Sequence, residues 1–269
     1  MTTTLGTLDQ RLREKEMFDA VKRFGKKYLI LSGKGGVGKT TVAVNLAWTK
    51  AKLGYRVGLL DVDLHGPDLG DALFIDARLE VDEDKRLIPV EAAPNLWVLT
   101  IQHLLSRKDE SLMWRGPRKM RAIIQFIGET AWPELDYFFI DSPPGTGDET
   151  LTVIRNISDL KGVIVSTGHR MAISDVSKAI DCLKLNNTPI HGLVDNFSAL
   201  ICPDCGKQVP LFDQGATMAL AEQENIPYLG SLVMEPKAVR QSDQAKKPLV
   251  EAAPNSALAK QIVSLAEKF

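Results

Sequence analysis

The sequence predicts an α/β fold: a mostly parallel, twisted sheet with helices on both faces. Three observations support this prediction. Short apolar runs alternate along the chain with segments of helical periodicity, which is typical of a parallel sheet covered by helices. Two of these runs end in aspartate, at Asp61 and Asp141, and a third is followed by a glycine-rich turn that opens a helix. Polar groups therefore gather at the carboxyl ends of the predicted strands, where open α/β sheets bind their ligands.

The glycine-rich turn follows the first predicted strand, residues 27–31, and reads SGKGGVGKTT over 32–41. Its spacing is that of a phosphate-binding loop, in which glycines let backbone N–H groups surround a phosphate at a helix N-terminus. We expect Lys39 to reach the β- and γ-phosphates and the Thr40 hydroxyl to bind Mg²⁺. A turn without a ligand is the alternative, and the complete spacing argues against it. The candidate nucleotide-binding residues of the loop are Gly33, Gly35, Gly36, Val37, Gly38, Lys39, Thr40 and Thr41.

A second lysine, Lys34, follows the first glycine of the loop, where an ordinary phosphate-binding loop does not need one. It cannot easily fold back onto phosphates that its own loop already surrounds. A lysine in this position could reach the nucleotide of a neighbouring subunit, as arginine fingers do in trans. Taken alone, however, Lys34 is more typical of a solvated lysine at the edge of a loop.

Carboxylates end two further predicted strands. The strand at 56–60 leads to Asp61 and Asp63, which would point to the same side of an extended chain, toward Mg²⁺ and the attacking water. A polar turn is the alternative. The strand at 135–140 ends in Asp141, which we expect to hold Mg²⁺ through water. The loops that follow, 64–68 and 142–148, are suited to switches that respond to the nucleotide.

The remaining elements continue the alternation. A short hairpin is predicted at 79–90 and an amphipathic helix ending at 127, and the last helix places Leu258, Ile262, Leu265 and Phe269 at helical spacing. Further strands are predicted at 96–100, 162–166, 190–194 and 227–230, and further helices at 41–53 and 174–185. Residues 1–26 are polar and have leucines at helical spacing, which predicts an N-terminal helical extension. No linker divides 27–269, so we expect a single phosphate-loop ATPase domain there.

Composition restricts the function further. The chain has 269 residues, 44% hydrophobic and 25% charged, which is ordinary for a soluble globular protein. Its net charge of −1 gives no reason to expect nucleic acid as a partner. No apolar run is long enough to cross a bilayer, and the last helix lacks the basic face of a membrane-surface anchor. The first residues do not resemble a secretory signal, so we expect a cytoplasmic protein without a membrane partner.

Two of the three cysteines form the pair Cys202-Pro203-Asp204-Cys205. Two thiolates can chelate a soft metal centre but do not complete a zinc site or an iron–sulfur cluster. A twofold dimer would supply the second pair at its axis. Structural zinc between subunits and a thioredoxin-like redox pair are alternatives, and spacing alone does not distinguish iron from zinc. The third cysteine, Cys182, is expected to be a small core thiol.

From about residue 28 to its end, the chain resembles the Mrp/ApbC family of iron–sulfur cluster carrier ATPases, which has a deviant Walker A loop. The motifs that carry the resemblance are, in order, GKGGVGKTT, DVDLHGP, WRGP, FIDSPPGTGDE, GLVDNFS, ICPDCG and the closing segment IPYLGSLVMEPKAVRQSDQAKKPLV. The sequence departs from the family at 166–170, where Ser-Thr-Gly-His-Arg replaces a usual Thr-Pro-Gln. It also lacks the N-terminal cysteine cluster of the eukaryotic cytosolic branch.

The resemblance implies a homodimer that binds ATP and Mg²⁺, hydrolyses ATP slowly and holds a labile [4Fe–4S] cluster on Cys202 and Cys205 of both subunits. Such carriers transfer the cluster to apo-proteins, and aerobic preparations could hold zinc instead. The resemblance also implies that Asn196 contacts adenine, that Lys34 acts across the dimer and that Asp63 orients or activates water. Two alternatives stay open: a positioning ATPase that acts on membrane or DNA, as septum-site and partition proteins do, and a dimeric ATPase with structural zinc.

Overall fold

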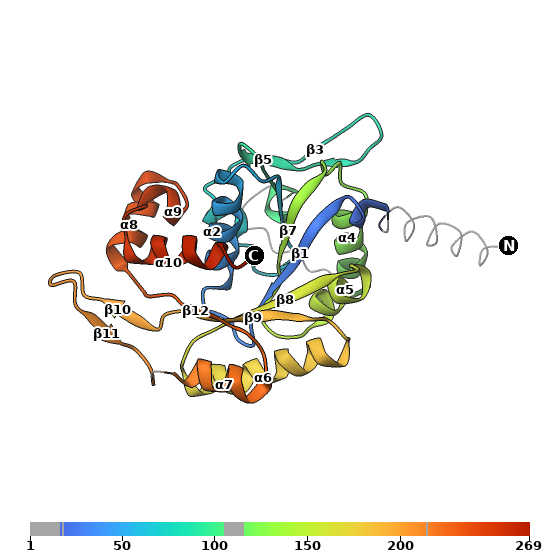
Figure 1. Cartoon of the computed structure of the whole chain (residues 1–269). Helices are drawn as coiled ribbons and strands as arrows, with labels where there is room; N and C mark the ends of the chain where they lie inside the picture. The colour runs from blue at the N-terminus through green and yellow to red at the C-terminus, as the bar shows by residue number, and fades with distance from the viewer. Residues whose placement is uncertain (1–16, 18, 105–115, 214) are drawn as a thin grey trace.

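An eight-stranded sheet forms the centre of the molecule (Figure 1), with the strand order β12-β9-β8-β1-β7-β2-β6-β5. The computed structural model describes residues 17, 19–104, 116–213 and 215–269. Every pairing in this sheet is parallel except that of β5 with β6. The strands are β1 (Phe24–Leu31), β2 (Val57–Asp61), β5 (Val90–Ala93), β6 (Leu96–Leu99), β7 (Leu135–Asp141), β8 (Leu160–Ser166), β9 (Ile190–Asp195) and β12 (Tyr228–Ser231).

Helices cover both faces of the sheet, as predicted (Figure 1). One face carries α2 (Lys39–Lys52), α8 (Pro236–Ala245), α9 (Leu249–Ala252) and α10 (Ala257–Ala266). The other carries α4 (Gly116–Gly128), α5 (Asp148–Asn156), α6 (Arg170–Leu185) and α7 (Ala216–Glu224). The short elements are α3 (Leu69–Ala72), the 3₁₀ helix η1 (Ile101–Leu104) and two small antiparallel pairs, β3 (Glu80–Val81) with β4 (Leu87–Ile88) and β10 (Ala199–Ile201) with β11 (Gln208–Pro210).

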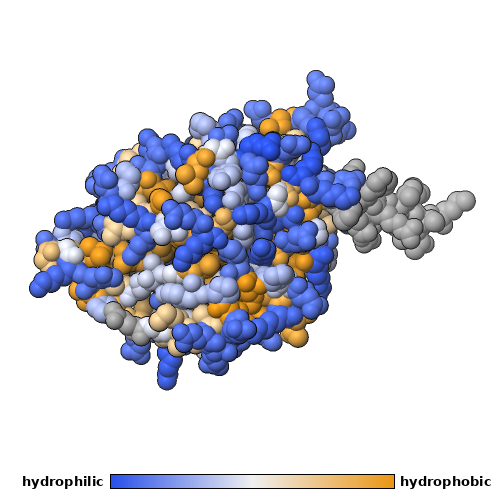
Figure 2. Space-filling view, viewed as in Figure 1, coloured by the Kyte–Doolittle hydropathy of each residue, from blue (hydrophilic) through white to orange (hydrophobic). Residues whose placement is uncertain are grey.

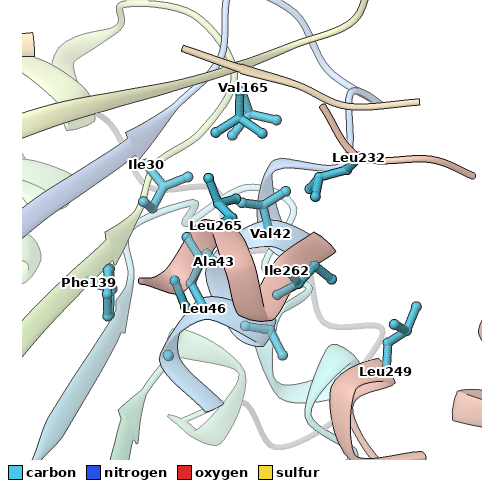
Figure 3. Close-up of a cluster of buried hydrophobic side chains, with 14 of the residues drawn as sticks. Ile30, Val42, Ala43, Leu46, Phe139, Val165, Leu232, Leu249, Ile262 and Leu265 are labelled. Carbon is cyan, nitrogen blue, oxygen red and sulfur yellow. The ribbon is translucent and has the colours of Figure 1, made fainter. Parts of the chain in front are cut away.

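The central strands are buried on both sides, which explains why their sequences are nearly continuous apolar runs. Alternate residues of β1 enter different cores: Ile30 packs toward α2 and α10, whereas Leu31 packs toward α4, α5 and α6. Figure 3 shows the first core, in which Leu46 of α2 and Leu265 of α10 lie among side chains from the sheet. The outer face seen in Figure 2 is mostly hydrophilic with scattered apolar side chains.

Strand β1 begins at Phe24, earlier than the predicted start at 27, so the predicted boundary at residue 26 falls within a strand. The reason is tertiary: Phe24 pairs with Leu135 in the sheet, and its ring stacks on Phe138 at 4.4 Å. Met17, just before it, is buried in the second core. Of the predicted helical extension, residues 17 and 19–21 are helical, and residues 1–16 and 18 lie outside the described part of the chain. No helix among the described residues is long and apolar enough to cross a membrane.

Candidate functional site

Three loops meet at the carboxyl ends of β1, β7 and β2, which are neighbours in the sheet. In the strand register Asp141 lies beside both Ile30 and Asp61. The loops after these strands surround a cavity of about 390 Å³. Its lining consists of Ser32, Lys34, Gly35, Gly36, Val37, Gly38, Lys39, Thr40, Thr41, Asp63, Gly66, Asp68 and Pro144. The fold therefore brings the predicted phosphate loop and Asp63 together around one space.

The loop from β1 to α2 has the backbone form that its glycines predict. Gly36 and Gly38 have φ angles of 79° and 82°, which only glycine adopts without strain. Helix α2 starts directly after the loop, and no side chain caps its N-terminus, so its first N–H groups are free to bind an anion. Gly33 does not line this cavity. A side chain there would collide with the backbone of α6 at Asp175, so this glycine is required by helix packing.

Lys39, Thr40 and Asp141 form one hydrogen-bonded cluster. The Lys39 ammonium lies 2.6 Å from Asp141 Oδ1, and the Thr40 hydroxyl donates to Asp141 Oδ2 at 2.6 Å. Asp141 is buried, and burial raises the pKa of its carboxyl even though Lys39 favours the charged form. The carboxylate thus orients both side chains that the sequence assigned to phosphate and magnesium.

Asp61 and Asp63 have different surroundings, contrary to the expectation that both face the site. Asp63 lines the cavity, and its carboxylate accepts hydrogen bonds from the backbone N–H groups of His65 and Gly66. Asp61 is fully buried, and accepts from the Thr100 hydroxyl and from the Asp63 N–H, each at 2.9 Å. Burial, and then the nearby Asp141, raise the pKa of Asp61 well above its usual value. The chain turns after β2, so the alternation of an extended strand does not continue to Asp63.

Lys34 is exposed at the edge of the cavity. Among the described residues, its ammonium interacts with Asp175 of α6, whose pKa is lowered by Lys178 and, to a smaller extent, by the charge of Lys34. Because it is exposed, the side chain is available to a group outside this chain.

Asn196 lies between the phosphate loop and a second, mostly apolar cavity of about 390 Å³. Its Nδ2 donates to the backbone carbonyl of Val37 at 2.8 Å, and its side chain fills the space where Gly38 has no Cβ. The second cavity is also lined by Phe197, Met234 and Val239, to which the sequence analysis assigned no role. The resemblance had placed the segment around Met234 in a shared motif without giving it a function. Phe197 lies beside Asn196 in the motif GLVDNFS, and this was the signal that could have pointed to it.

Cys202 and Cys205 lie in the turn that joins β10 to β11. Cys202 is half-buried and Cys205 exposed, and the turn is closed by hydrogen bonds from Cys202 N to Lys207 O and from Gly206 N to Cys202 O, both 2.9 Å. The backbone N–H groups of Cys205 and Asp204, and the Cys205 thiol, donate to the Cys202 sulfur and lower the pKa of that thiol. Within the ranges that the structure describes, no group of three or more His, Cys, Asp or Glu residues could hold a metal. One chain therefore offers the two thiols as an incomplete ligand set.

The cysteine hairpin is joined to the second cavity by backbone hydrogen bonds. Ile201 N donates to Met234 O at 2.8 Å, and Met234 N donates to Ala199 O at 2.7 Å. The third cysteine, Cys182, is partly buried on α6 against the second core, as expected of a core thiol.

The ParA family model, described as NUBPL iron-transfer P-loop NTPase, matches residues 23–269. The chain belongs to this family. It is 40% identical over 277 residues to the iron-sulfur cluster carrier protein of Pyrococcus horikoshii, an alignment that covers 98% of this chain and 91% of that protein. It is 41% identical to the cytosolic Fe-S cluster assembly factor NUBP2 homolog of Culex quinquefasciatus, covering 82% of this chain and 87% of the relative.

Solved structures agree with the family assignment. A nucleotide-binding protein from Archaeoglobus fulgidus, solved in complex with ADP, is 30% identical, with a TM-score of 0.71 over 95% of this chain and 92% of that one. The cell division ATPase MinD of Pyrococcus furiosus shares the fold with a TM-score of 0.65 at 24% identity, over 91% of this chain and 98% of its own. The predicted fold and the predicted family are both confirmed, and the chain is a P-loop NTPase of the iron-transfer type.

Proposed function

We propose that this protein is an ATP-hydrolysing carrier of an iron–sulfur cluster, which two copies hold between them and transfer to apo-proteins in the cytoplasm. The observation that carries the proposal is the combination in one chain of a complete phosphate loop with a partly exposed pair of thiols that forms an incomplete ligand set. The names of the relatives from Pyrococcus horikoshii and Culex quinquefasciatus support the same function.

The two adjoining cavities suit the two parts of ATP. The phosphates occupy the cavity of the glycine-rich loop, where backbone N–H groups, the α2 N-terminus and Lys39 bind their negative charge. The base occupies the apolar cavity beside Asn196 and Phe197. The donor set also fits Mg²⁺, because a hydroxyl and a carboxylate, Thr40 and Asp141, converge within 2.6 Å. These residues would hold the ion, directly or through water, and it would neutralise phosphate charge.

Hydrolysis uses a carboxylate of the same chain, at the wall of the cavity, and a lysine of the partner subunit. Asp63 orients or activates the attacking water, since its side chain lines the cavity. Its backbone N–H donates to the Asp61 carboxylate, which holds the residue in place. Lys34 stabilises the phosphates of the partner subunit, which accords with its exposed position at the edge of the cavity. The slow rate and the coupling of hydrolysis to cluster transfer are parts of this proposal.

The cluster itself is the cargo. Four thiolates are needed for a [4Fe–4S] cluster, and a twofold dimer supplies them from Cys202 and Cys205 of each chain. Partial exposure of both thiols accords with release to an acceptor protein.

The test is anaerobic reconstitution with iron and sulfide, followed by measurement of iron, sulfide and oligomeric state. We expect about four irons per dimer, bound only while both cysteines are present. Cys182→Ala is the matched control and should load normally, because its thiol lies on α6 in the second core. Normal loading of Cys202→Ala/Cys205→Ala would refute the carrier function. Retention of zinc alone under anaerobic conditions would instead indicate a dimeric ATPase with structural zinc.

A further inference from the structure

A nearly buried ion pair lies beside the phosphate cavity and uses residues that the hydrolysis described above does not. Lys119 of α4 and Glu149 of α5 are 2.8 Å apart, and their side chains are only 13% and 9% exposed. The Lys119 ammonium also contacts Nε2 of His65, and His65 Nε2 lies 4.0 Å from Glu149 Oε1. One ammonium therefore serves two acceptors that come from different parts of the fold.

These three residues come from the segments that flank the cavity. His65 belongs to the loop after β2, two positions beyond Asp63, and its own backbone N–H donates to the Asp63 carboxylate. Glu149 lies in the first turn of α5, directly after the loop 142–147 that follows Asp141. Lys119 is in α4, whose first residue Gly116 lies close enough to α5 that a Cβ there would be 3.4 Å from Asp148.

The electrostatics favour a fixed link. Burial raises the pKa of Glu149, but the hydrogen bond from Lys119, a hydrogen bond from the Glu149 backbone N–H and the nearby charges of Lys119 and His65 together hold that pKa below its ordinary value. Glu149 is therefore ionised near neutral pH and Lys119 balances its charge. Because a lysine ammonium has three donors, it can bind the carboxylate and the imidazole at the same time.

We propose that Lys119 is a positioning residue for nucleotide hydrolysis, tying the loop that carries Asp63 to the helix that follows the Asp141 loop. The inference rests on the proposed role of Asp63. Lys119 does not line the phosphate cavity and therefore acts through the loop rather than on the nucleotide. Loss of the link frees the far end of the Asp63 loop, while Lys39 and the glycine-rich loop keep their contacts.

The first test replaces Lys119 with methionine, which keeps most of the unbranched side chain and removes its charge. We expect kcat for ATP hydrolysis to fall by about tenfold or more, since small misplacements of reacting groups have large effects on rate. The Kd for a non-hydrolysable ATP analogue should remain within about twofold of the wild-type value, because the contacts that bind the nucleotide before reaction are not altered. Lys119→Arg should restore most of the turnover. Lys184→Met is the matched control: it breaks the 2.7 Å pair of Lys184 with Glu224, far from the cavity loops in sequence, and should leave kcat unchanged.

A second variant separates positioning from folding. Lys119→Met alone leaves a buried carboxylate without its lysine, whereas Lys119→Met/Glu149→Gln removes both charges and should recover the lost stability. The proposal predicts that turnover stays low in the double variant and that the amides of His65 and Gly66 exchange hydrogen faster. Wild-type kcat in either variant, or an equal loss of analogue binding and turnover, overturns it. Asp63→Asn is measured in parallel: if that variant keeps its turnover, the proposed role of Asp63 fails instead.

Discussion

Asn196 donates a hydrogen bond from its side chain to the backbone carbonyl of Val37, although the two residues are 159 positions apart in the sequence. The bond joins the phosphate loop to the segment that runs into β10 and on to Cys202. It also fixes the boundary between the two cavities, because Asn196 lines one of them and Val37 the other.

Replacing Asn196 with alanine should weaken nucleotide binding. The buried carbonyl of Val37 loses its donor, which costs about 1–3 kcal/mol and distorts the loop that surrounds the phosphates. Calorimetric titration with an ATP analogue should show an affinity loss of about tenfold. Asn186→Ala is a matched control, since Asn186 also donates to a backbone carbonyl at 2.8 Å, that of Cys182 at the end of α6. Equal affinities of the Asn196 variant and wild type would contradict the structural role given to this bond.

Lys39→Ala should abolish nucleotide binding and also lower stability. The substitution removes the ammonium that lies 2.6 Å from Asp141 and leaves that buried carboxylate with only the Thr40 hydroxyl. Breaking a buried pair in this way costs about 3–5 kcal/mol. Thermal unfolding and analogue binding are the two measurements. The double variant Lys39→Ala/Asp141→Asn should recover stability without recovering binding, and binding by either protein would show that Lys39 does not contact the phosphates.

Lys34→Ala should leave binding intact and remove most of the turnover. The side chain is exposed, and its charge only adds to that of Lys178 in favouring the ionised Asp175, so its loss should change stability little. Mixing the Lys34 variant with an Asp63→Asn variant tests the interface directly. Mixed dimers should recover activity at one of their two sites if Lys34 acts across the interface. Wild-type turnover in the Lys34→Ala variant would show that Lys34 does not act across the interface.

His103 should make stability fall as the solution becomes acidic. Burial lowers the pKa of this imidazole from 6.5 to about 4, and neither ring nitrogen has a hydrogen-bond partner among the described residues. Below the unfolded-state pKa the unfolded chain binds a proton that the folded chain does not, so stability decreases as pH falls from that value toward the folded pKa. The total effect is on the order of 3 kcal/mol at the acidic end of that window. Urea unfolding of wild type and His103→Leu at several pH values should give curves that diverge below neutral pH, and parallel curves would exclude the effect.

The sequence predicted those features that depend on local pattern. The glycine-rich loop, the strand that ends in Asp141 and the cysteine pair are contiguous motifs with fixed spacing, and helices cover both faces as the alternation of segments implied. The role of Gly33 was harder to assign, because its contact with the backbone of Asp175 arises only when α6 packs against the loop.

Features that depend on distant partners were not predictable. The buried carboxylate of Asp61 is stabilised by a hydrogen bond from the hydroxyl of Thr100, which follows the neighbouring strand β6. The pair of Lys119 and Glu149 joins two helices that are 30 residues apart at these positions, with no periodic signal between them. The N-terminal limit of β1 likewise depends on the packing of Phe24 against β7, which no local pattern indicates.

The hairpin of β10 and β11 contributes no strand to the eight-stranded sheet and projects from the body of the molecule (Figure 1). The thiols are thus carried on an appendage, whereas the nucleotide cavity is built from the scaffold. Replacing residues 199–210 by a plain turn would leave the strand order of the eight-stranded sheet unchanged and delete both thiols together. Likeness of scaffold alone is therefore a poor guide to which proteins of this shape handle metal.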